Sequence, residues 1–114
     1  MKTNMIFFGW NHPVRGKERV SAEHFQQITG WFQELQAKGT LTSWEPVFLT
    51  SHGGDMNGFF ILRGDGDKLD ALAATPEWME HTIRASLHLD GVGVVRGFSG
   101  AAVMEAMGTW SKFI

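Results

Sequence analysis

The sequence predicts a single α+β domain over residues 1–114, with the order strand, helix, strand, strand, helix, strand around one four-stranded antiparallel sheet. Three observations predict it. The length is typical of one domain. Short apolar runs bounded by turn residues alternate with one long stripe of apolar residues at helical spacing. Turn residues separate the two middle runs, as in a hairpin between two strand–helix–strand units.

The first half of the chain supplies a strand and the clearest helix. Residues 3–10 form a short apolar run typical of a buried strand, and residues 11–16 form a loop by their Asn, Pro and Gly. Ser21 is suited to cap the helix, which could also begin one turn earlier near Lys17. Gly39 is a normal helix stop. The spacing of three, four and three residues places four side chains on one face, namely Phe25, Ile28, Phe32 and Leu35.

The middle of the chain predicts a hairpin. Residues 41–50 form the second strand, and Pro46 within it favours an edge position because proline cannot donate to a neighbouring strand. Residues 51–57 are rich in Ser, Gly, Asp and Asn and form the hairpin loop. Residues 58–63 form a third strand that is apolar on both sides.

The second half completes the arrangement. A helix in two pieces covers 67–74 and 76–88, and the second piece starts with a Thr cap and Pro in its first turn. Residues 91–98 form the fourth strand, and a short final helix extends from residue 99 or 100 to about residue 112. This order is the ferredoxin-like one, and the right-handed crossover rule then gives the strand order 4-1-3-2.

The predicted sheet is apolar on both faces. In the first strand, Met5 and Phe7 point to one face, while Ile6, Phe8 and Trp10 point to the other. Two helices cover only one face, so the other would be an apolar patch of several hundred Å², which is large for a monomer. Burying it stabilises by roughly 25 cal/mol per Å². We therefore expect a homodimer that pairs the two sheets, and the alternative is that the final helix folds over the open face.

Composition limits the function classes. Apolar residues make up 43% and charged residues 19%, and the net charge of −2 gives no basic excess for nucleic acid. The absence of cysteine excludes disulfides, thiolate metal sites and cysteine nucleophiles, and it favours the cytoplasm. No apolar stretch approaches the roughly 20 residues of a membrane span, and the apolar run near the N-terminus is short for a signal peptide. We expect a cytoplasmic protein without nucleic-acid or membrane partners.

Several phrases resemble the dimeric α+β-barrel superfamily, and its YciI-like branch most of all. They are Glu23-His24, Gly39-Thr40-Leu41, Glu45-Pro46, and residues 69–74 followed by Thr75-Pro76-Glu77-Trp78. The resemblance spans most of residues 3–98 and suggests an uncharacterised neighbouring family. It implies a homodimer with a pocket between sheet and helices in each protomer. YciI-like proteins often carry a His and an Asp proposed as an active-site pair. The resemblance matches His24 to that His, and no Asp stands in the first helix.

The topology gathers polar loop residues at one end of the sheet. The loop after the first strand, the hairpin loop and the junction before the fourth strand meet there, and they carry His12, His52, Asp55, His88 and Asp90. Such residues can form an acid–base site, a metal site, a polar pocket rim or plain solvated loops. No pair has a local ligand spacing such as HxH, so we expect no metal. His12 is a candidate proton carrier, and His52 and His88 are candidate ligand contacts.

The first helix and first strand offer further candidates. His24 precedes Phe25 and can serve as a base, because imidazole titrates near neutrality, or it is a helix-flank residue with a backbone or water partner. Trp10 and Phe25 can wall a pocket for a flat apolar ligand, and other tryptophans at such spacings are more often core.

The predicted function is binding of a small organic molecule. If the protein is an enzyme, it acts without a tightly held cofactor, with His24 or His12 as proton carrier and Trp10 and Phe25 shaping the pocket. The alternative is a non-catalytic module whose main property is dimerisation. A third possibility, haem held by a histidine, is decided by an absorbance spectrum.

Overall fold

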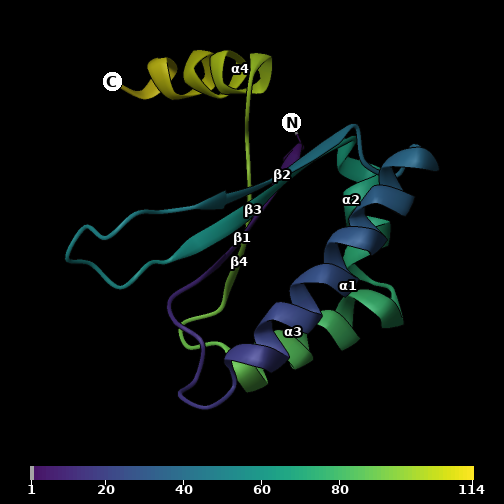
Figure 1. Ribbon diagram of the computed structural model, residues 1–114. Coiled ribbons are helices and arrows are strands. Elements are labelled where there is room, and N and C mark those ends of the chain that lie inside the picture. The colour runs from purple at the N-terminus through teal and green to yellow at the C-terminus, as the bar shows by residue number, and fades with distance from the viewer. Residues whose placement is uncertain (1) are drawn as a thin grey trace.

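The computed structural model describes residues 2–114 and confirms the predicted order of elements (Figure 1). The four strands are as follows: β1 (Met5–Trp10), β2 (Ser43–Phe48), β3 (Gly58–Arg63) and β4 (Gly93–Gly97). The helices are as follows: α1 (Glu18–Ala37), α2 (Gly66–Ala73), α3 (Pro76–His88), α4 (Ala101–Trp110) and a closing 3-10 turn, η1 (Ser111–Phe113). Strand β3 has the predicted limits, β1 begins two residues later than predicted, and β2 and β4 are one to two residues shorter at each end, as is usual for element boundaries.

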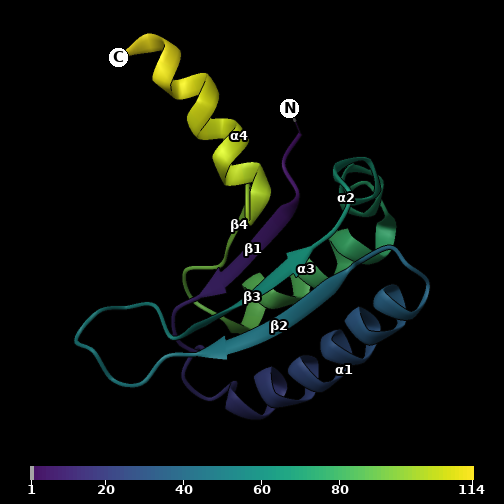
Figure 2. The same ribbon diagram turned by 90° about the horizontal axis from the view of Figure 1, so that it is seen from above.

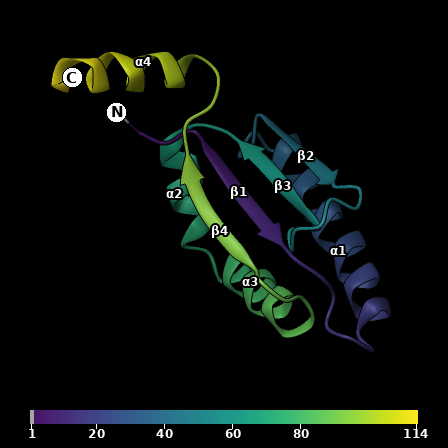
Figure 3. The ribbon, with the colours of Figure 1, turned by 90° about the vertical axis from the view of Figure 1, so that its left-hand side faces the viewer.

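The strands form one antiparallel sheet in the order β2-β3-β1-β4, which is the predicted 4-1-3-2 order read from the opposite edge (Figure 3). In the register, Phe8 of β1 lies opposite both Phe60 of β3 and Val94 of β4. Pro46 stands on β2 at the edge of the sheet, as expected. The helices α1, α2 and α3 all lie on one side of the sheet (Figure 1).

The helices α1 and α3 start in different ways. Thr75 caps α3, and its hydroxyl accepts a hydrogen bond from the Trp78 N–H at 3.2 Å, as predicted. The proposed Ser21 cap is wrong. The helix α1 begins a turn earlier, because the N–H of Ser21 already bonds to the carbonyl of Lys17 at 3.0 Å. Ser21 is therefore a helical residue whose side chain is free for another partner.

The core fills the space between the sheet and the helices. Ile6, Phe8 and Leu62 from the sheet are at most 1% exposed, and they pack with Phe32 of α1 and Leu69 of α2. The opposite face is also apolar but has no cover among residues 2–114. There Phe7 and Phe59 contact each other with ring centroids 4.9 Å apart, and Ile61 and Val95 lie beside them in the register.

The helix α4 does not cover this open face, so that alternative is wrong. It extends beyond the end of the sheet, away from α1 and α3, and among residues 2–114 it contacts no other helix or strand except η1 (Figure 2). None of its residues is buried. Its exit is fixed by Asn4, whose side chain exchanges two hydrogen bonds with the backbone of Ser99 at 2.8 and 3.0 Å. No helix within residues 2–114 is long and apolar enough to cross a membrane.

Candidate functional site

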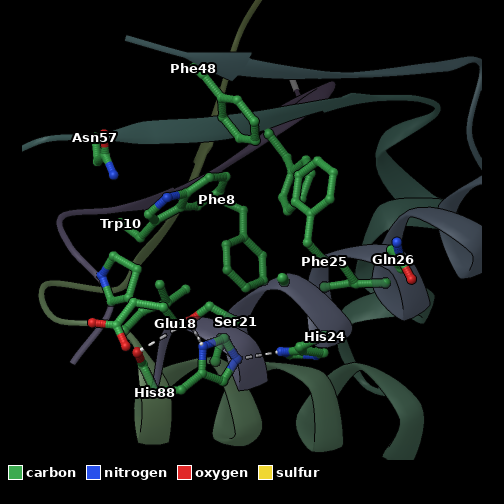
Figure 4. Close-up of a pocket in the computed structure, with 16 residues that line it drawn as sticks. Phe8, Trp10, Glu18, Ser21, His24, Phe25, Gln26, Phe48, Asn57 and His88 are labelled. Atoms are coloured by element: carbon green, nitrogen blue, oxygen red, sulfur yellow. Dashed lines mark hydrogen bonds between the residues drawn. The ribbon is translucent and has the colours of Figure 1, made fainter. Parts of the chain in front are cut away.

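A cavity of about 520 Å³ lies between the sheet and the helices α1 and α3 (Figure 4). Its volume is in the usual range for small-molecule sites. Five aromatic side chains contribute to its wall: Phe8, Trp10, Phe25, Phe48 and Phe60. The polar part of the lining comes mainly from Glu18, Ser21, His24, Gln26, Asn57 and His88.

The aromatic rings form a wall suited to a planar ligand. The ring of Phe25 stacks on Phe60 at 22° with centroids 5.5 Å apart, and Trp10 lies 5.1 Å from the same Phe60 ring. Phe48 at the sheet edge contacts Phe25 at 5.3 Å and remains 68% exposed, which places it at the mouth. Stacked and tilted aromatic contacts of this kind favour flat apolar molecules.

A chain of hydrogen bonds starts at the cavity wall and runs between α1 and α3. The Oγ of Ser21 lies 2.6 Å from Nδ1 of His88. Nε2 of His88 lies 2.7 Å from Nδ1 of His24, and Nε2 of His24 lies 2.9 Å from Nδ1 of His81. Figure 4 shows the His88 ring between Ser21 and His24. We call the four residues Ser21, His88, His24 and His81 the histidine relay.

The protons of the relay can be arranged in two ways that make every link a hydrogen bond. In the first, Ser21 donates to His88, which donates through Nε2 to His24, which in turn donates to His81. In the second, every ring donates in the opposite direction, and the Ser21 hydroxyl donates to the carbonyl of His88 at 3.4 Å. The two arrangements differ by one proton moved along each link. The relay therefore connects the cavity to its outer end at His81.

Burial keeps the histidines neutral. His24 is 3% exposed, and burial lowers its pKa from 6.5 to about 4, assisted by Arg84 and by the other two rings of the relay. Burial, followed by Arg84, also lowers the pKa of His88 and of His81. At neutral pH each ring therefore carries one proton and has one unprotonated nitrogen, which can accept a hydrogen bond or take up a proton.

The outer end of the relay differs from the inner end. His81 does not line the cavity and is only half-buried. Its ring stacks on Trp31, with centroids 4.7 Å apart, while its Nδ1 edge meets Nε2 of His24 in nearly the same plane. His88 and Ser21 face the cavity instead. The buried ring of His24 thus separates a cavity end from an outer end.

Four of the six residues singled out in the sequence line one cavity: Trp10, His24, Phe25 and His88. His88 belongs to the last turn of α3 rather than to the following loop. The loop after β1 does meet the end of α3, since the N–H of Val14 bonds to the carbonyl of His88 at 2.8 Å.

His12 and His52 do not line the cavity, and both are exposed. The His52 ring contacts its own loop, with Nε2 2.7 Å from the carbonyl oxygen of Met56. The hairpin loop extends beyond the sheet instead of folding over the cavity (Figure 2). Only Asn57 at the base of that loop reaches the lining.

Sequence reasoning missed Ser21 and His81. A usable signal was present, because His81 and His88 are seven residues apart and so share a face of α3 after two turns. Ser21 and His24 likewise share a face of α1. Which residues of α1 and α3 contact each other depends on how the two helices cross. The spacing of residues within each helix does not determine that crossing.

The arrangement favours proton transfer over metal binding. Within residues 2–114, no group of three or more His, Asp or Glu side chains is placed to hold a metal ion. Both ring nitrogens of His24 and of His88 are committed to the relay.

Comparisons with known proteins support the fold. No family model matches the chain, and no curated protein matches it either. A solved structure from Bacteroides fragilis, described as a dimeric protein of unknown function with a ferredoxin-like fold, matches with a TM-score of 0.50 and 15% identity. The match covers 87% of this chain and 100% of that one. At this level of identity the likeness shows the fold alone, and the fold is ferredoxin-like.

Proposed function

We propose that the protein binds a small, mostly apolar organic molecule in the aromatic cavity and exchanges a proton with it through the histidine relay, without a tightly held cofactor. The observation that carries the proposal is the unbroken chain from Ser21 at the cavity wall to His81 at the outer end. Three neutral imidazoles in series are costly to bury unless each is bonded, and here each one is.

The lining suggests what the ligand carries. Five aromatic rings favour a planar apolar body. Trp10 and Asn57 also line the cavity, and within residues 2–114 neither side chain donates a hydrogen bond to the protein. An indole N–H and an amide can both donate to an oxygen of the ligand. We therefore propose an aromatic or alkyl molecule with a hydroxyl or carbonyl oxygen.

The first experiment uses 2-naphthol, an aromatic alcohol whose fluorescence shifts to longer wavelength when it loses its proton. We expect one molecule bound per chain, with emission from the deprotonated form, because the excited naphthol is a much stronger acid than the ground-state molecule and neutral His88 then accepts its proton. Phe25→Glu places a charge in the wall and should weaken binding at least about tenfold. The control Gln33→Glu adds the same charge on the exposed side of α1, outside the cavity.

Equal weakening by both variants would count against the cavity as the binding site. If 2-naphthol binds without the long-wavelength emission, the cavity is a binding site but the proposed proton transfer is excluded. His88→Phe separates the two properties, since it should retain binding but abolish the shift in emission.

We also propose that the protein is a cytoplasmic homodimer related to the YciI-like branch of the dimeric α+β-barrel superfamily. The open face of the sheet carries Phe7, Phe59 and Ile61 without cover in this chain, and the Bacteroides fragilis protein of the same fold is described as dimeric. The helix α4 provides a second, independent argument for a dimer. A helix of 10 residues without tertiary contacts is marginal in water, so it needs a surface to pack against.

The apolar side chains of α4 suit such packing. They recur at spacings of four and three residues, as Val103, Met107 and Trp110. Light scattering on a size-exclusion column should report twice 12.7 kDa. Ile61→Glu, at the centre of the open face, should give the monomer, whereas Gln33→Glu should leave the dimer intact. A monomeric wild-type chain would exclude this assembly.

A further inference from the structure

We infer that Ser21 is the nucleophile of an acyl-transfer reaction, activated by His88 and supported by His24, that cleaves small esters whose aromatic or alkyl part occupies the cavity. The inference rests on the proposed function of the cavity and names its reaction and substrate class. It starts from three atoms in series, Oγ of Ser21, Nδ1 of His88 and Nδ1 of His24, which match the logic of a nucleophile, a base and an orienting group.

The Ser21 side chain behaves unlike four other hydroxyl residues in the helices of this molecule. Thr29, Thr82, Ser86 and Ser111 all donate to a carbonyl three or four residues earlier in the chain, which is the ordinary local bond of such residues. Ser21 instead lies 2.6 Å from a ring nitrogen on another helix, at the wall of an apolar cavity. It is also not the cap of its helix. The contact with His88 therefore accounts for the placement of Ser21, and the start of helix α1 does not depend on this residue.

His88 is placed to act as the base. One ring nitrogen faces Ser21, and the other is 2.7 Å from His24, so a proton taken from Ser21 leaves both nitrogens hydrogen-bonded. His24 accepts from the resulting imidazolium, and the next bond to His81 lets the positive charge be shared along the relay. A neutral imidazole stabilises the imidazolium less than a carboxylate does. We therefore assign activated esters with good leaving groups, such as phenyl esters, and not amides.

The reaction balances with water as the only co-reactant. The Oγ of Ser21 bonds to the ester carbonyl carbon while its proton moves to His88. The bond from that carbon to the leaving oxygen breaks, and the oxygen takes the proton from His88 and departs as a phenol or alcohol. Water then attacks the acyl group, gives a proton to His88 and releases the carboxylic acid, while Ser21 regains its proton. Trp10, Gln26 and Asn57 are lining residues whose side-chain N–H groups can donate to the carbonyl oxygen.

The test uses an alkyl fluorophosphonate, whose phosphorus is attacked by activated serines with release of fluoride. Peptide mapping of the wild-type protein should locate one adduct, on Ser21. Ser21→Ala should abolish the adduct, while Ser86→Ala, the matched control on α3, should leave it unchanged. His88→Phe should slow labelling by about 10²- to 10⁴-fold, the usual contribution of a general base.

His24 is a positioning residue in this scheme. His24→Gln should slow labelling and move the pH midpoint of the labelling rate, whereas a purely structural role would change the amount of folded protein and not the midpoint. An unlabelled wild type, or an adduct that persists in Ser21→Ala, overturns the inference. If 2-naphthol still binds with proton transfer in that case, only the acyl-transfer step fails. If 2-naphthol does not bind either, the proposed function fails with it.

Discussion

The two faces of the sheet carry similar side chains but have different surroundings. On one face, Phe8 and Phe60 lie beneath α1 and α3, at most 3% exposed, and border the cavity. On the other, Phe7 and Phe59 lie half-buried against each other with no helix above them. The alternation that normally distinguishes core from solvent is missing because both faces are apolar. An apolar strand face therefore predicts that the face is buried. The sequence pattern does not say whether a helix of the same chain or another molecule covers it.

The difference extends to the helices. The helices α1 and α3 bury a stripe of side chains and, between them, the relay that hydrogen bonds join from Ser21 to His81. No residue of α4 is buried. One layer is packed within the described residues and contains the relay, whereas α4 and the open sheet face have no cover among residues 2–114.

The largest expected effect contrasts two neighbours on β1. Phe8→Ala should lower the free energy of unfolding by about 3–5 kcal/mol, since Phe8 is 1% exposed in the core. Phe7→Ala removes the same atoms from the open face and should cost about 1 kcal/mol in the monomer. Urea denaturation of both variants in the Ile61→Glu background isolates the monomer. Equal losses would mean that the two faces are equally covered.

The second effect is acid sensitivity of the relay. Because the pKa of His24 falls from 6.5 in the unfolded chain to about 4 in the fold, the unfolded state binds more protons between these values. Stability should therefore be complete above about pH 7 and decline as the pH falls, by roughly 3 kcal/mol at pH 4 from His24 alone. The lowered pKa values of His81 and His88 act in the same direction.

Urea denaturation at several pH values checks this dependence, with His24→Gln for comparison. The variant should lose less stability than the wild type over the same range. A wild-type protein whose stability is independent of pH from 7 to 4 would contradict the buried neutral relay.

The smallest effect concerns α4. Trp110→Ala should weaken dimer association by about 1–3 kcal/mol, since a large aromatic anchor in an interface typically contributes this much, without changing the stability of the monomer. Trp110 is 56% exposed in the single chain, so no internal contact is lost. Sedimentation at a series of concentrations measures the dissociation constant. An unchanged constant would remove α4 from the interface.

Much of the fold follows from local patterns. The stripe from Phe25 to Leu35 and the Thr75-Pro76 start each specify an element locally, and the handedness of crossovers then orders the strands. Pro46 could be assigned to an edge for the same kind of local reason. Of the two predicted starts of α1, the one near Lys17 is confirmed and the Ser21 cap is wrong, because a suitable cap residue stands one turn inside the helix.

The site was predictable only in part. Trp10 and His24 could be assigned to the space between sheet and helix from strand alternation and helix periodicity. The bond between His24 and His88 joins residues 64 positions apart and depends on the packing of α1 on α3. His12 and His52 were predicted as site residues and do not line the cavity. The topology places their loops at one end of the sheet but does not determine where the side chains point.

A crystal structure of the protein soaked with 2-naphthol tests the central claim most directly. We expect the naphthalene ring against Phe25 and Phe60, with its hydroxyl directed to the Ser21 and His88 end of the cavity. A ring found instead on the open face or against α4, with the cavity empty, would contradict it.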